Sequence, residues 1–81
     1  MNADEIRSTA FRHFVEPART RGETTIMINA GELADKLRVR DRMPAICGAI
    51  GANKFKDEFG LELLSRTGPQ SGRSATFTFK I

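Results

Sequence analysis

Apolar positions recur with two different periods along the chain, and these periods predict both helices and strands. Over the first twenty residues the apolar side chains fall at spacings of three and four, which predicts one amphipathic helix over residues 4–20. Pro17 lies inside this pattern. Because proline lacks an N–H and its ring crowds the preceding turn, we expect it to kink the helix or to end its first part.

A short strand and a second helix follow. The run at residues 24–29 (TTIMIN) is rich in β-branched side chains and differs from the helical pattern on either side, so it predicts a strand. Asn29 stands three residues before Glu32, which is the spacing of a capping box. This spacing predicts that a helix begins near residue 30, and its apolar positions extend it over residues 30–37.

A third helix is expected over about residues 42–59. Asp41 is expected to cap its start, and Pro44 falls in the first turn, where a missing N–H costs nothing. Phe55 and Phe59, four residues apart, continue the apolar pattern toward its end. The inner face of this helix is expected to consist of Met43, Ile46, Cys47 and Ile50.

The end of the chain predicts an antiparallel hairpin over residues 61–81. Residues 61–67 have the composition of a strand, and residues 68–74 (GPQSGRS) that of an exposed loop. Beyond the loop, apolar side chains alternate with threonine and lysine, as they do in a half-buried strand. Two such strands joined by a loop rich in glycine, proline and serine form a hairpin.

This order of elements, α-β-α-α-β-β in a single α+β domain over residues 1–81, resembles the winged-helix (winged helix-turn-helix) DNA-binding superfamily. Residues 30–34, 44–47 and 77–79 are also similar to small microbial proteins of that type. The resemblance implies three helices and a three-stranded antiparallel sheet in which the short strand pairs with the hairpin. It also implies that the loop at residues 68–74 is the wing and that the domain binds double-stranded DNA, with transcription regulation as the biological role.

The residue types that support catalysis and metal binding are scarce. Among 81 residues there is one histidine, His13, and one cysteine, Cys47. One residue of each type cannot supply the ligand cluster of a zinc site, and a lone cysteine cannot form an intrachain disulfide. Cys47 lies on an apolar helix face and is expected to be a small buried hydrophobe. We therefore expect no enzymatic activity, no cofactor, no metal and no small-molecule ligand.

The composition favours a cytoplasmic location. No apolar run approaches the roughly 20 residues needed to span a bilayer, so no association with membranes is expected. The first five residues carry two acids and no apolar stretch, unlike a signal peptide. The single cysteine suits a reducing compartment.

The net charge of +3 is unevenly distributed along the chain. Residues 1–37 contain five basic and six acidic residues, a net charge of −1, whereas residues 38–81 contain eight basic and four acidic residues, a net charge of +4. The excess therefore lies in the turn, third helix and hairpin, the parts that a winged helix offers to DNA. This distribution favours binding of a polyanion more than the total charge does.

The candidate DNA-binding residues fall into two groups. Cations that flank the third helix or lie in the hairpin are expected to contact phosphates: Arg38, Arg40, Arg42, Lys54, Lys56, Arg66 and Arg73. Small or amide side chains opposite the apolar helix face are expected to face the groove: Ala45, Gly48, Ala49 and Asn53. Because few of these side chains can read base edges, we expect binding of low sequence specificity.

Two alternatives remain open at this stage. The domain could instead be a protein-interaction or homodimerisation module, since the first helix has extra apolar positions at Ile6 and Ala10 and the last strand could lie at a sheet edge. Separately, Gly48 and Gly51 form a GxxG step that resembles the loop of a KH domain, which would clamp single-stranded RNA. A loop at this step, joining two helices, would favour the KH alternative.

Overall fold

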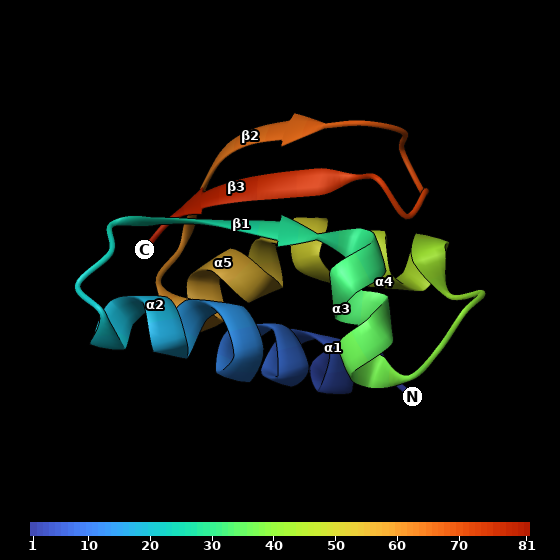
Figure 1. The fold of residues 1–81 in the computed structure, drawn as a ribbon, viewed down its shortest axis with the longest axis horizontal. Helices are drawn as coiled ribbons and strands as arrows, with labels where there is room; N and C mark the ends of the chain where they lie inside the picture. Colours follow the sequence, from blue (N-terminus) through green and yellow to red (C-terminus); the bar gives the residue numbers. More distant parts are fainter.

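A three-stranded antiparallel sheet covers one side of a layer of helices in the computed structural model, which describes residues 1–81 (Figure 1). The strands are β1 (Thr25–Asn29), β2 (Glu62–Thr67) and β3 (Thr76–Lys80), in the spatial order β1-β3-β2. The predicted α+β class and the pairing of the short strand with the hairpin are confirmed. The last strand is central, so the expectation that it could lie at an edge was wrong.

The first helical segment is continuous but changes its winding. It consists of α1 (Ala3–Ala10), a π-helical turn η1 (Phe11–Val15) and α2 (Glu16–Thr20). The backbone N–H of Glu16 bonds to the carbonyl of Phe11, five residues back. This wider turn directly precedes Pro17, which lies in the first turn of α2 and could not have continued a regular ladder. At the place where a kink or an end was predicted, the regular α-helix thus gives way to a π turn and the helical segment continues.

The next helix, α3 (Ala30–Leu37), begins as the sequence predicts. The side-chain oxygen of Asn29 accepts a hydrogen bond from the backbone N–H of Glu32 at 3.0 Å, which satisfies one of the unpaired donors of the first turn. The helix ends at Arg38, whose backbone is left-handed with φ 60°. The chain then turns toward the next helix.

The predicted single helix over residues 42–59 was wrong, because two helices occupy this region. They are α4 (Met43–Gly51) and α5 (Asn53–Phe59), separated by extended backbone at Ala52 with φ −78° and ψ 151°. Two glycines in the last turn of α4 weaken helix propagation at this point. The GxxG step itself is helical and forms no loop between helices, so the arrangement expected for the KH alternative is not found.

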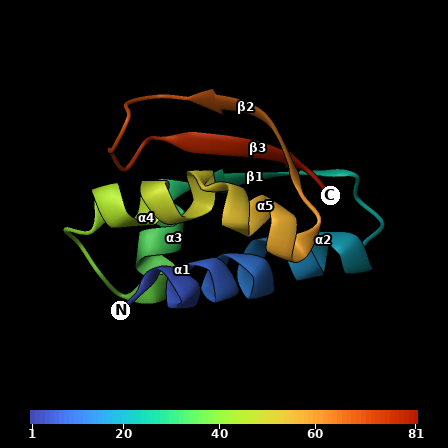
Figure 2. The same cartoon turned by 180° about the vertical axis from the view of Figure 1, so that it is seen from behind.

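The helices and the sheet enclose one apolar core of 19 buried residues (Figures 1 and 2). Phe77 and Phe79 point into it from β3, and the ring of Phe55 from α5 meets Phe79 edge-to-face at 5.4 Å between centroids. Ile6 and Ala10 of α1 are also fully buried, at 1% and 0% exposure. The apolar surplus expected on the first helix is therefore used in the core. None of the helices is long and apolar enough to span a bilayer.

The base of the hairpin loop is bonded to the first turn of α3. The backbone N–H of Ala30 donates to the carbonyl of Ala75 at 2.8 Å, and that of Gly31 donates to the carbonyl of Arg73 at 2.9 Å. A Cβ atom on Gly31 would lie 2.9 Å from the same Arg73 oxygen, so only glycine permits this approach. The loop between β2 and β3 is consequently held beside α3.

A pair of glycine-to-alanine variants tests this contact. We expect Gly31→Ala to lower the free energy of unfolding by about 1–3 kcal/mol, because the new methyl group meets backbone that cannot move freely. Gly48→Ala is the matched control in α4, where a Cβ atom would meet nothing within 4 Å. That variant should gain about 0.5–1 kcal/mol from helix propensity. Urea denaturation measures the free energy of unfolding of both variants. Equal changes in the two would contradict the close packing of Gly31 against Arg73.

Candidate nucleic-acid interface

The turn between α3 and α4 carries three arginines within five residues. Arg38, Arg40 and Arg42 are all exposed, and none of their side chains forms an ion pair or hydrogen bond within the chain. Arg38 ends α3 in the left-handed conformation, and Arg42 directly precedes α4. Three unpaired guanidinium groups are thereby concentrated at the connection between two fixed helices.

No side chain caps the start of α4, beside this turn. The N-cap residue is Arg42, and no side chain accepts a hydrogen bond from the first turn. Asp41 was expected to cap this helix and does not, because it stands one residue before the N-cap position. The first turn contains Pro44 and no acidic residue. The positive end of the helix dipole therefore adds to the charge of the arginines.

The outward face of α4 is smooth and lacks polar side chains. Ala45 and Gly48 are exposed, as predicted for groove-facing residues. The placement of Ala49 on this face was wrong: it is only 4% exposed, because one helical step of about 100° carries it from the outward side toward α1. Asn53 is exposed but belongs to α5, beyond the break, and so does not extend the face of α4.

An apolar hollow of about 280 Å³ lies between α4 and the beginning of the chain. Its α4 side is formed by the small residues of the outward face and by Ala49, and its other side by the first turns of α1. The lining residues are Met1, Asn2, Ala3, Ile6, Arg7, Pro44, Ala45, Gly48 and Ala49.

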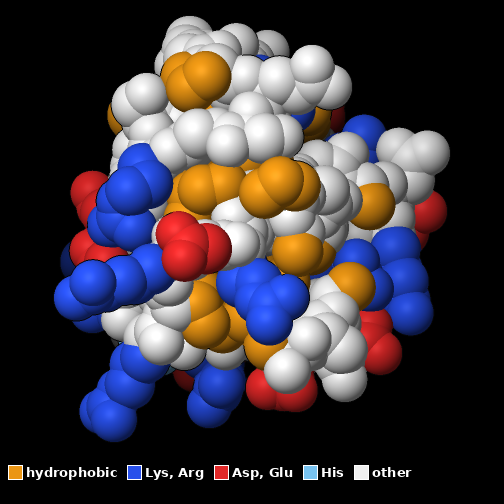
Figure 3. Space-filling view, turned by 90° about the vertical axis from the view of Figure 1, so that its right-hand side faces the viewer, with side chains coloured by type: hydrophobic (Ala, Val, Ile, Leu, Met, Phe, Trp, Pro, Cys, Tyr) orange, Lys and Arg blue, Asp and Glu red, His pale blue; other side chains and the backbone are white.

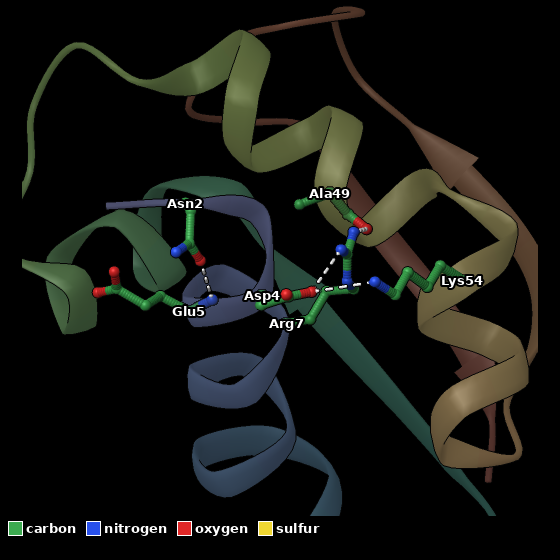
Figure 4. A network of polar contacts seen from close by, with 6 residues as sticks. All are labelled: Asn2, Asp4, Glu5, Arg7, Ala49 and Lys54. Atoms are coloured by element: carbon green, nitrogen blue, oxygen red, sulfur yellow. Dashed lines mark hydrogen bonds and ion pairs between the residues drawn. The ribbon is translucent and has the colours of Figure 1, made fainter.

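A buried arginine that the sequence analysis missed fixes α1 against the end of α4 (Figure 4). Arg7 is 7% exposed, pairs with Asp4 at 2.9 Å and donates to the backbone carbonyl of Ala49 at 3.5 Å. That carbonyl belongs to the last turn of α4, where the helix break leaves carbonyls without a helical partner. Asp4 also accepts a hydrogen bond from the ammonium group of Lys54 at 3.3 Å.

The sequence does indicate the burial of Arg7, through the apolar residues that share its helix face. The residues four before, three after, four after and seven after it share its helix face and are all apolar: Ala3, Ala10, Phe11 and Phe14. A cation in the middle of an apolar helix face has to find acceptors within the fold.

The remaining predicted phosphate contacts differ from the arginine turn, because most of them already have partners. Lys54 is held by Asp4, and Arg73 pairs with Asp35 at 2.9 Å. The guanidinium of Arg66 lies over the ring of Phe77, 4.7 Å from its centroid, and donates to backbone carbonyls of the hairpin loop. Lys56 forms no ion pair, but it lies in α5, and the whole of α4 separates α5 from the arginine turn (Figure 2).

The surface around the turn is positive in patches. Figure 3 shows the end of the molecule that carries the α3–α4 turn and the hairpin loop. Lys and Arg side chains gather on its lower half, interspersed with acidic side chains and apolar areas, whereas the upper part is largely uncharged. The positive surface therefore does not continue without interruption from the helices onto the loop.

Comparison of the chain with models of known protein families, with curated proteins and with solved structures gave no match. What the domain binds is therefore inferred from its own fold and surface.

The Asp4 contacts have a consequence for acid stability. The hydrogen bond from Arg7, followed by that from Lys54, holds the pKa of Asp4 below its ordinary value. A lowered carboxyl pKa stabilises the fold above the unfolded-state value, and this contribution is lost as the pH falls through the folded-state value. We expect wild type to lose stability more steeply than Asp4→Asn between about pH 5 and about pH 2.

Urea denaturation at a series of pH values measures this difference. Asp57→Asn removes an exposed carboxylate that forms no ion pair and is the matched control. It should retain the pH dependence of wild type. An identical pH dependence for Asp4→Asn and wild type would show that the Arg7 contact is absent in solution.

Proposed function

We propose that this domain is a winged helix that binds double-stranded DNA through the α3–α4 turn, mainly by contacts to phosphates. The fold assignment is supported by the order of a helical segment, β1, the helices α3, α4 and α5, and the β2–β3 hairpin. It is also supported by the sheet order β1-β3-β2, in which the short first strand pairs with the hairpin. In this assignment α3 and α4 are the helix-turn-helix pair, and the loop between β2 and β3 is the wing.

The observation that carries the proposal is the unpaired arginine turn. Arg38, Arg40 and Arg42 are exposed and have no internal partner, so they bind phosphate without first breaking an ion pair. A guanidinium presents its donors in a planar fork that matches two phosphate oxygens. The uncapped start of α4 lies at the same place and favours an anion electrostatically. All of these features favour a polyanion as the partner.

The outward face of α4 favours weak sequence specificity. The exposed residues on this face are Pro44, Ala45 and Gly48, and none of them has a side-chain donor or acceptor for a base edge. A face of such small side chains allows the helix backbone to come close to a groove or to the sugar-phosphate backbone. Affinity should therefore depend mainly on phosphate contacts, and binding should be strongly salt-dependent.

A second candidate function is a protein-interaction module, and the apolar hollow beside α4 favours it. The hollow exposes Met1 and the small residues of α4 next to the arginine turn. A partner seated there would cover Pro44, Ala45 and Gly48 of α4. Sedimentation velocity shows whether the domain forms a homodimer through this surface. A dimer that does not bind duplex DNA would favour the second candidate.

Salt-dependent binding to duplex DNA tests the proposed function. We expect the logarithm of the binding constant of wild type to fall with the logarithm of the salt concentration with a slope of about −2.7, or about −0.9 for each of three phosphate contacts. The triple variant Arg38→Ala, Arg40→Ala, Arg42→Ala should lose binding even at low salt. Fluorescence anisotropy with a labelled duplex of unrelated sequence measures both.

A triple variant with the same change in net charge is the control. Arg12, Arg21 and Lys80 lie outside the turn, the wing and α4, and their replacement by alanine should leave most of the binding intact. If both triple variants lose the same amount of affinity for duplex DNA, the loss is explained by net charge alone, and a defined interface at the turn is contradicted. Absence of any duplex binding by wild type at low salt would refute the proposed function.

A further inference from the structure

The wing contains a single charged side chain, and that side chain is held against α3. In residues 68–74 only Arg73 is charged. Its guanidinium donates to the carboxylate of Asp35 at 2.9 Å and to the backbone carbonyl of Gly31 at 3.2 Å. Its own carbonyl accepts the N–H of Gly31. Both the main chain and the side chain of the wing arginine are thus bonded to α3.

Asp35 lies between the two groups of cations that could contact DNA. On one side it pairs with Arg73 of the wing, and on the other its carbonyl accepts the backbone N–H of Arg38, the first arginine of the turn. Its side chain is 69% exposed and that of Arg73 is 51% exposed. An acidic side chain between the arginine turn and the wing agrees with the interrupted positive surface of Figure 3.

An ion pair this exposed is weak, but the Asp35 carboxylate offsets the charge of Arg73 and repels a phosphate that approaches it. The backbone contacts keep the main chain of residue 73 beside α3, and the side-chain Nη2 bonds both Asp35 and the carbonyl of Gly31. The arginines of the turn form no ion pair. A phosphate therefore gains less from Arg73 than from Arg38, Arg40 or Arg42.

We propose that Asp35 competes with DNA phosphate for Arg73 and keeps the wing arginine out of the DNA-contacting surface. This inference rests on the proposed function and deepens it. The wild-type domain binds duplex DNA through the turn without Arg73, and the wing acts as a support for α3. Neutralising Asp35 releases Arg73 and adds the wing to the interface.

A double-mutant cycle on duplex binding tests the competition. The variants are Asp35→Ala, Arg73→Ala and the two combined, measured against Glu32→Ala as the matched control. Glu32 is an exposed acid on the same helix whose side chain has no partner, so its removal changes the net charge equally but frees no arginine. Thermal unfolding of each variant verifies that it is folded.

The expected results separate release of Arg73 from a simple change in charge. Asp35→Ala should bind duplex DNA about two- to fivefold more tightly than Glu32→Ala, the range set by the strength of an exposed ion pair. Its salt slope should be more negative by about 0.9, which corresponds to one added phosphate contact. Arg73→Ala alone should change neither affinity nor slope by a comparable amount, and the combined variant should return to the level of Glu32→Ala.

Two results would overturn the inference. Equal affinity and slope for Asp35→Ala and Glu32→Ala would show that no contact is released. A loss of affinity in Arg73→Ala alone, with a shallower slope, would show that the wing arginine already binds DNA. Either result leaves the proposed function standing if the arginine-turn variant still loses binding. If no variant binds duplex DNA at low salt, the proposed function fails and this inference fails with it.

Discussion

The position of the candidate interface depends on the contact between the first turn of α3 and the base of the hairpin loop. Two backbone hydrogen bonds, from Ala30 and Gly31, join the start of α3 directly to the end of this loop. Their geometry requires a residue without a Cβ atom at position 31. Because these bonds fix the first turn of α3, they also fix the direction of its axis and the position at which the arginine turn begins. The sheet, α3 and the turn therefore behave as one framework.

Local patterns were sufficient to predict most of the elements, and the errors have identifiable physical causes. The Asn29 cap and the alternation in β3 depend on neighbours a few residues away, so the sequence displays them directly. The break at Ala52 was missed because the apolar pattern on both sides is helical. Its trace in the sequence is the spacing of five residues between Ile50 and Phe55, where a continuous helix would have three or four.

The candidate site was harder to predict than the fold, because ion pairs between distant residues leave no local pattern. Asp4 pairs with Lys54, fifty positions away, and Asp35 pairs with Arg73, thirty-eight positions away. In both cases an acid from the slightly acidic first part of the chain neutralises a cation from the basic second part. The +4 excess of residues 38–81 therefore overstates the positive charge that is free to bind a polyanion.

Amide chemical shifts during titration with a short duplex test the location of the interface most directly. If the arginine turn binds phosphate, the largest shifts should fall on residues 38–46, which include the turn and the start of α4, while the amides of residues 68–74 in the wing move little. Shifts centred on α5 or on the exposed edge of β1, or no shifts at low salt, would contradict the assignment of DNA binding to the α3–α4 turn.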